Sequence, residues 1–200
     1  DENAPFYFVW MTYLIVFLFK YSFTSWIAGF LLYTIGTVII LQASVIFSIV
    51  VIGFLTPMIL RILHKRYYSH LQLHGYGTWF SPIWVLFKSS FMMIFLFVIL
   101  IPVYFVPVLN IIAFSIPFYY FFHKLLNFDV SSTILSAEQY KIIYEKEANN
   151  FRLRTLFLYF ISMIPFATLF TAVYYIIYLG HAYFVKLDEL KKEEIKLISN

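Results

Sequence analysis

The sequence contains no cysteine, and it has few charged residues for its length of 200. The lack of cysteine excludes disulfides, thiolate catalysis and cysteine-ligated zinc or iron–sulfur sites. Only 12% of the residues are charged and 62% are hydrophobic, whereas soluble domains average roughly a quarter and a half. No charged residue lies between Lys20 and Arg61 or between Lys88 and Lys124. Because a bilayer crossing needs about 20 apolar residues, we predict an all-α integral membrane protein.

Several motifs of nucleotide and hydrolytic chemistry are also missing. The sequence has no Walker-type loop, GxGxxG turn, Gly-x-Ser-x-Gly elbow or His-Glu-x-x-His. His70 and His74 are four residues apart, as zinc ligands on a helix are, but no carboxylate or cysteine lies nearby in sequence. The apolar blocks also contain no acid, and of the ionisable groups that mark intramembrane enzyme sites they hold only His181, near the end of the second block. We therefore predict that the protein is not an enzyme, and we expect no catalytic residue, cofactor, metal or nucleic-acid partner.

The charges that are present fall in three polar regions. Residues 61–88 carry four basic residues and no acid, residues 124–154 carry five basic and four acidic residues, and residues 186–200 carry four of each. The positive-inside rule counts Lys and Arg, so all three regions are expected in the cytoplasm. The few charges before residue 21 would then lie near the other face.

The amino-terminal segments leave two topologies open. Residues 6–19 are a short apolar run suited to the interface, unless they continue past Lys20. Residues 21–60 would be about 60 Å long as one helix. We favour reading residues 6–63 as an interfacial segment plus one long, tilted transmembrane helix, with a tight pair of crossings as the alternative. Residues 64–82 are polar and contain Gly-Tyr-Gly, which predicts a helix end followed by a cytoplasmic loop.

Two apolar blocks, residues 89–122 and 155–185, resemble each other. Each contains an Ile-Pro break, and a shift of 58 places Pro107 on Pro165. Both blocks begin and end beside regions expected in the cytoplasm. Each can therefore form two arms of about 15 residues, roughly 22 Å long, that enter and leave by one face. We predict long transmembrane helices plus two proline-broken re-entrant helical hairpins; single spans with prolyl kinks are the alternative.

The remaining segments complete one membrane domain over residues 1–200. Residues 136–154 predict an amphipathic cytoplasmic helix that begins with a capping box of Ser136 and Gln139. Residues 186–200 predict a solvated cytoplasmic tail. Within the long helix, the polar residues are expected to make interhelical hydrogen bonds rather than to contact substrate. These residues are Gln42, Ser44 and Ser48.

Short motifs along the chain point to a family. Residues 53–57 (GFLTP) end the long helix, and residues 101–111 (IPVYFVPVLNI) form the break in the first block. With residues 118–129 (FYYFFHKLLNFD), the charged helix and the block centred on Pro165, they resemble the CysZ sulfate permease and etoposide-induced-protein family of bacterial inner-membrane proteins. The resemblance covers most of the chain after about Trp26.

The resemblance implies a multi-pass bacterial inner-membrane protein with two helix pairs that penetrate part-way, assembled as a homo-oligomer among membrane lipids. It also implies passage of sulfate, or a related oxyanion, into the cytoplasm for sulfur assimilation. Without a nucleotide site, such a permease would be channel-like. A non-transporting membrane scaffold, or an accessory subunit of a larger complex, is the alternative. The family's Gly-Leu-Arg-type sulfate-binding motif has no match here, and residues upstream of Asp1 would have to carry it together with one helix.

An anion path through the two blocks has to use neutral groups, because neither block contains Lys or Arg. If the second arm of each hairpin begins at mid-membrane, its free N–H groups and positive dipole end face the turn. Anion binding at such a terminus needs no lysine. Prolines that only kink packed helices are the alternative. The predicted path residues are Pro102, Pro107, Asn110, Pro165 and Thr168.

A cytoplasmic vestibule is the second predicted site. Basic residues at the end of the long helix could concentrate anions there, although topology and lipid headgroup binding are commoner roles. In the family that the chain resembles, charges of the helix between the blocks meet across subunits near the pore entrance. The vestibule candidates are Arg61, Lys65, Arg66, Glu145, Arg152 and Arg154.

Overall fold

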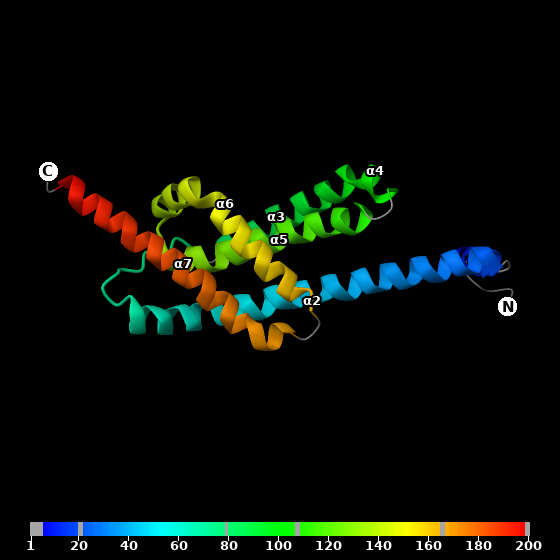
Figure 1. The fold of residues 1–200 in the computed structure, drawn as a ribbon, viewed down its shortest axis with the longest axis horizontal. Helices are drawn as coiled ribbons and strands as arrows, with labels where there is room; N and C mark the ends of the chain where they lie inside the picture. The colour runs from blue at the N-terminus through cyan, green and yellow to red at the C-terminus, as the bar shows by residue number, and fades with distance from the viewer. Residues whose placement is uncertain (1–5, 20–21, 79, 107–108, 165–166, 199–200) are drawn as a thin grey trace. The chain divides into compact units, whose positions relative to one another are not determined.

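The computed structural model describes residues 6–19, 22–78, 80–106, 109–164 and 167–198. These residues form seven helices, and no strand occurs among them (Figure 1). The helices are α1 (Phe6–Phe19), α2 (Ser22–Tyr67), α3 (Ser81–Ile99), α4 (Ile101–Tyr104), α5 (Leu109–Ile134), α6 (Ala137–Ser162) and α7 (Ala167–Ile198).

Among the described residues, three segments are long and apolar enough to cross a membrane: Ile39–Tyr67 of α2, Ser81–Ile99 and Leu109–Ile134. Large apolar side chains point outward from such helices; Phe54 is 87% exposed and Phe91 is 68% exposed. Water would oppose this arrangement, whereas lipid tails solvate it. The prediction of an all-α membrane protein is confirmed.

The chain forms two compact units, residues 1–40 and 41–200. The first contains α1 and the start of α2, where Trp26 stacks on Phe30 with ring centroids 6.1 Å apart. Residues 22–67 form a single helix, as the long-helix interpretation requires. The number of membrane crossings made by residues 6–60 stays a prediction. The second unit contains the rest of α2 and all later helices, and it holds every site described below.

The first apolar block folds back on itself, with α3 and α5 packed side by side (Figure 1). Pro82 lies in the first turn of α3, where its missing N–H costs nothing. Helix α3 ends at Ile99, because Pro102 cannot donate a helical hydrogen bond to the residue four before it. Aromatic rings join the two arms: Phe97 meets Phe118 edge-on at 5.2 Å.

The second apolar block also folds back, between α6 and α7, and its helices run beyond the predicted limits. Helix α6 begins with the predicted capping box, since Ser136 accepts from the Gln139 N–H and Gln139 accepts in return. It continues without interruption through Arg154 to Ser162. Helix α7 likewise continues past Val185 to Ile198. A change from polar to apolar side chains alters the solvent that a helix needs but leaves its backbone hydrogen bonds intact.

Helix α7 packs closely against α2. A Cβ added at Gly180 would lie 2.7 Å from the Leu60 Cδ2 atom, so only glycine allows this approach without movement of that side chain. Small residues commonly mark close helix contacts in membranes. Beside this contact, the Tyr68 ring stacks on Phe184 at 4.5 Å, and Phe151 stacks on Tyr183 at 4.3 Å.

Backbone hydrogen bonds hold the loop after α2 against the end of α5. The N–H groups of His74 and Tyr76 donate to the carbonyls of Ile134 and Leu135 at 3.2 and 3.1 Å. The predicted helix end and loop in residues 64–82 are confirmed, because α2 ends at Tyr67 and α3 starts at Ser81. A Cβ on Gly75 would lie 2.8 Å from the Ser132 carbonyl oxygen, a contact with backbone that cannot easily move.

We expect Gly75→Ala to destabilise the protein by about 1–2 kcal/mol, which lowers the melting temperature by roughly 3–6 °C. The measurement is thermal unfolding of the purified protein in detergent. Gly77→Ala is the matched control in the same loop, because its Cβ would approach Ser132 only to an ordinary 3.4 Å. Equal melting temperatures for the two variants would contradict the close packing of Gly75 against the end of α5.

Candidate functional site

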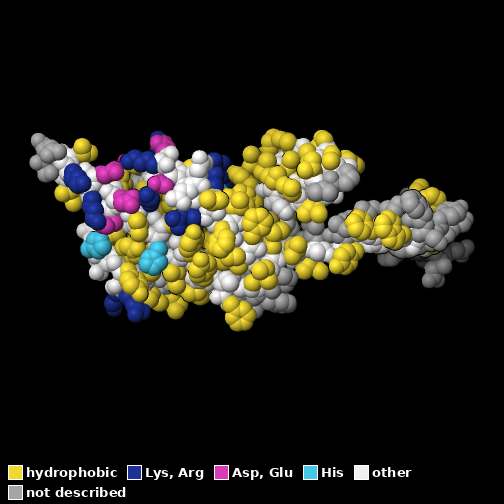
Figure 2. Space-filling view, in the orientation of Figure 1, with side chains coloured by type: hydrophobic (Ala, Val, Ile, Leu, Met, Phe, Trp, Pro, Cys, Tyr) yellow, Lys and Arg dark blue, Asp and Glu magenta, His cyan; other side chains and the backbone are white. Residues whose placement is uncertain are grey.

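Ion pairs connect the three polar regions at one end of the second unit (Figure 2). His70 Nε2 lies 3.2 Å from Asp188 Oδ1, and Lys146 Nζ lies 3.1 Å from Glu193 Oε2. Lys186 Nζ lies 2.7 Å from Glu147 Oε1. These contacts bring the loop after α2, the first half of α6 and the end of α7 together. A common membrane face for the three regions stays a prediction, which this clustering favours.

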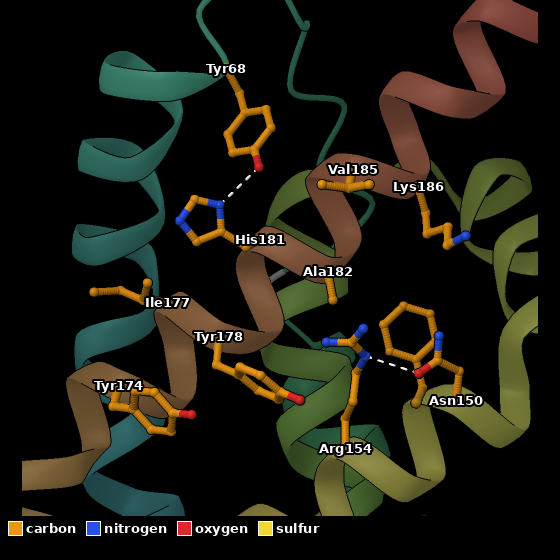
Figure 3. A pocket seen from close by; sticks show the side chains of 11 residues that line it. Tyr68, Asn150, Arg154, Tyr174, Ile177, Tyr178, His181, Ala182, Val185 and Lys186 are labelled. Carbon is orange, nitrogen blue, oxygen red and sulfur yellow. Dashed lines mark hydrogen bonds between the residues drawn. The ribbon is translucent and has the colours of Figure 1, made fainter.

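A cavity of about 450 Å³ opens beside these ion pairs (Figure 3). His181 of α7 faces it, and its Nδ1 is 2.8 Å from the Tyr68 hydroxyl. Arg154 of α6 points in from the other side. The wall combines aromatic rings with polar groups, and its residues are Tyr68, Asn150, Phe151, Arg154, Tyr174, Ile177, Tyr178, His181, Ala182, Val185 and Lys186.

The two cations of this cavity differ in their partners. Lys186 is neutralised by Glu147 and Glu189, at 2.7 and 2.9 Å. The hydrogen bond from Lys186 is the main reason that the pKa of Glu147 is lowered, and the same bond raises the pKa of Lys186. Arg154 instead donates from Nε to the neutral Asn150 Oδ1 at 3.0 Å, and its guanidinium lies 5.2 Å from the centroid of the Tyr178 ring.

No carboxylate of the described residues pairs with Arg154 within 4 Å. Its terminal nitrogens are therefore the cationic donors that this cavity can offer to an anion. A neighbouring hollow of about 310 Å³ is lined by Arg66 and shares Ile177 and His181 with the first. Two of the six vestibule candidates, Arg66 and Arg154, thus lie in adjacent hollows on either side of His181.

The other four vestibule candidates line neither hollow. Arg61 and Lys65 are exposed on α2, and Glu145 is exposed on α6. Arg152 is also exposed, and it donates to Asn149 Oδ1 at 3.3 Å. Their proposed roles stay predictions.

Three of the predicted path residues lie in described elements next to the turns of the two hairpins. Pro102 is in α4, and Asn110 is half-buried in the first turn of α5, where its N–H donates to the Val106 carbonyl at 3.1 Å. Thr168 is in the first turn of α7. Pro107 and Pro165 lie outside the described residues.

Buried polar groups tie the membrane helices together. Gln42 of α2 accepts from the Tyr159 hydroxyl at 3.1 Å, and Ser44 donates to the Ile164 carbonyl at 3.4 Å. The predicted interhelical hydrogen bonding is confirmed for Gln42, whereas Ser44 contacts the turn after α6. Ser48 donates instead to the Ser44 carbonyl in its own helix. The partner Tyr159 could not be identified from the sequence, because one tyrosine among 17 carries no signal of burial.

A second buried network joins α5, α6 and α7. His123 Nδ1 lies 2.6 Å from Thr155 Oγ1, and Asn127 donates to the His123 carbonyl at 2.8 Å. The Tyr183 hydroxyl donates to Asn127 Oδ1 at 2.8 Å. Because every member has a partner, this network holds the three helices in register.

The two histidines considered as zinc ligands lie in the loop after α2. His70 contacts Asp188, and His74 Nδ1 lies 3.1 Å from the Gln72 carbonyl. The described part of the chain contains no group of three or more His, Asp or Glu residues that could hold a metal ion.

Comparison with known proteins gives one match. The model of a family described as "Sulfate transporter CysZ/Etoposide-induced protein 2.4" matches residues 4–172, which include the motifs of the sequence resemblance up to the first part of the second apolar block. That resemblance is confirmed. The description names transport rather than an enzyme. No curated protein and no solved structure matches the chain.

The ion pair between α6 and α7 gives a prediction about pH. Because the pKa of Glu147 is lowered in the folded protein, its contribution to stability is complete above the pKa of the unfolded chain, about 4.3. That contribution is lost as the pH falls through the lower folded value. We expect Glu147→Gln to lower the melting temperature by about 1–3 °C at pH 7 and by progressively less below pH 4.

The matched control is Glu145→Gln, because Glu145 is exposed on the same helix and forms no ion pair among the described residues. Melting in detergent across pH 3–7 would compare both variants with the wild type. A Glu147→Gln deficit that does not change with pH would contradict this role of the carboxylate.

Proposed function

This chain belongs to the sulfate transporter CysZ/etoposide-induced protein 2.4 family, and from that premise we propose that it is a sulfate permease. It would carry sulfate, or a related oxyanion, through the bacterial inner membrane to supply sulfur assimilation. The sequence contains no nucleotide-binding loop, so passage would be channel-like. Family membership is the observation that carries this proposal.

The placement of charge on the first hairpin supports partial penetration. Lys88 is exposed on α3 only eleven residues before Ile99, which corresponds to about 17 Å of helix. If α3 crossed the whole bilayer, this ammonium would face lipid at a cost of about 3 kcal/mol. With Lys88 at the headgroups, the turn after α3 lies roughly half-way through a 30 Å core.

The position of Arg154 on α6 supports partial penetration of the second hairpin as well. Arg154 lies eight residues before the end of α6 at Ser162, or about 12 Å along the helix. With Arg154 near the headgroups, the turn between α6 and α7 also lies inside the hydrocarbon layer. These two distances support a re-entrant position for both hairpins, which is part of the proposal.

Both turns would then offer anion-binding groups without a fixed charge. Helices α5 and α7 begin at the turns, so their first-turn N–H groups and positive dipole ends would face the membrane interior. The half-buried amide of Asn110 adds a side-chain donor in the first turn of α5. Thr168 holds the corresponding position in the first turn of α7.

The cytoplasmic exit would be the vestibule around His181. Arg154 and Arg66 would hold a positive potential there, which keeps a dianion near the end of the path. Lys186, already paired with two carboxylates, would contribute less. Assembly as a homo-oligomer is expected from the family resemblance and forms part of the proposal.

The proposal is tested by uptake of radiolabelled sulfate into liposomes that contain the purified protein. We expect saturable uptake above that of protein-free liposomes. Asn110→Leu should lower the uptake rate about tenfold, because a hydrogen bond to a charged group contributes roughly 1.5–3 kcal/mol. Ile111→Leu is the matched control, since Ile111 is the next residue in the first turn of α5 and its side chain is exposed.

Unchanged uptake in Asn110→Leu would contradict the role of this residue but not transport itself. No uptake by the wild type would contradict the permease and favour the scaffold or accessory subunit.

A further inference from the structure

The hollow that Arg66 lines lies between α2 and α7, and its α2 wall is apolar except at one end. Its volume is about 310 Å³. The residues of the α2 wall recur every three or four positions, so they lie along one helical face. In order along the helix they are Ile59, Ile62, Leu63, Arg66 and Tyr67. The hollow therefore has an aliphatic wall with a cation at one end.

The opposite wall is one face of α7. It carries Val173, Ile177 and His181, which are spaced four residues apart. The His181 ring lies against the Tyr67 ring, with centroids 5.7 Å apart. The aromatic rings of both walls thus meet at the charged end, and the aliphatic side chains lie at the other. Amphipathic rings favour the boundary between water and lipid, so this order of side chains matches the order of zones in a bilayer.

The course of α2 places the charged end of the hollow at the membrane surface. Ile39–Tyr67 is apolar enough to span a membrane, and its Lys and Arg residues begin only at Arg61. Ile59 precedes Arg66 by seven residues, or about 10 Å of helix, toward the apolar part. A long basic side chain at the end of a span keeps its charge among the headgroups. The aliphatic walls then lie in the hydrocarbon layer, where acyl chains rather than water cover them.

Arg66 has no anionic partner in the part of the chain that the structure describes. No carboxylate there lies within 4 Å of its guanidinium, which is 5.5 Å from the centroid of the Tyr67 ring. Residues 61–88 contain no acid. A guanidinium can hold a phosphate by two parallel hydrogen bonds. A free guanidinium at the headgroups, above an aliphatic hollow, is complementary to a lipid that carries a phosphate and an acyl chain.

The cavity on the other side of His181 has a different wall. It includes Asn150 and Lys186, which offer polar contacts to a small ion. We propose that the Arg66 hollow instead binds an anionic phospholipid, with the phosphate on Arg66 and one acyl chain along the aliphatic walls of α2 and α7. This inference goes beyond the proposed function and does not require transport. The bound phosphate would neutralise Arg66, which leaves Arg154 as the cation of the vestibule.

The test measures lipid binding by native mass spectrometry of the full chain in an uncharged detergent. The protein is titrated with phosphatidylglycerol or with phosphatidylcholine, whose phosphate is balanced by its own cation. We expect the first phosphatidylglycerol to bind about tenfold more tightly than phosphatidylcholine. Arg66→Gln should remove this difference, because the charge-assisted hydrogen bond is lost. Lys65→Gln is the matched control, since Lys65 is an exposed cation that does not line the hollow.

A second variant tests the aliphatic wall. Val173 is 42% exposed, so the larger ring of Val173→Trp can fill the hollow without entering the core. We expect both lipids to bind about tenfold more weakly to this variant, because the acyl chain loses its apolar contact. Phe170→Trp is the matched control, since Phe170 is exposed on the same helix but lies outside the hollow.

Three results would overturn the lipid site. The first is an unchanged affinity of Arg66→Gln for phosphatidylglycerol. The second is displacement of the lipid by an excess of inorganic phosphate alone, which would show an anion site that makes no use of the acyl chain. The third is loss of a dimer in Val173→Trp with lipid binding unchanged, which would show that a second copy of the chain covers the hollow. Sulfate uptake is not measured, so none of these results depends on the permease.

Discussion

The cost of placing a charged group in hydrocarbon governs the proposed membrane arrangement. Lys88 and Arg154 mark the points on α3 and α6 beyond which each helix has no further charge. Only about 17 Å and 12 Å of helix separate these residues from the turns that follow, less than the roughly 30 Å of a bilayer core. If the two cations stay at the headgroups, neither turn can reach the opposite face.

The turns then need protection from lipid, because irregular backbone cannot be left unsatisfied there. Helix α2 provides part of that protection, since Ser44 donates to the Ile164 carbonyl in the turn of the second hairpin. A buried hydrogen bond from the Tyr159 hydroxyl of α6 to Gln42 of α2 lies close in sequence to this contact on both helices.

The sequence predicts those parts of the fold that local rules decide. Pro102 and the Ser136–Gln139 capping box mark where helices end or begin, and the structure agrees. Helix α6 continues through Arg154 to Ser162, although the side chains change there from polar to apolar, because its backbone hydrogen bonds do not depend on side-chain polarity. Among the vestibule candidates, only the structure separates Arg66 and Arg154 from the rest, since lining a cavity depends on packing between distant helices.

The most direct test of the account is the side from which each hairpin turn can be labelled. The chain has no cysteine, so single cysteines can be introduced at Phe105, Ile164 and, as a reference in the polar loop, Ser69. A membrane-impermeant maleimide is then applied to either face of oriented membranes. The account predicts that Ser69→Cys reacts from the cytoplasmic face and that neither turn reacts from the opposite face. Reaction of Phe105→Cys or Ile164→Cys from that opposite face would show a full crossing and contradict the re-entrant hairpins.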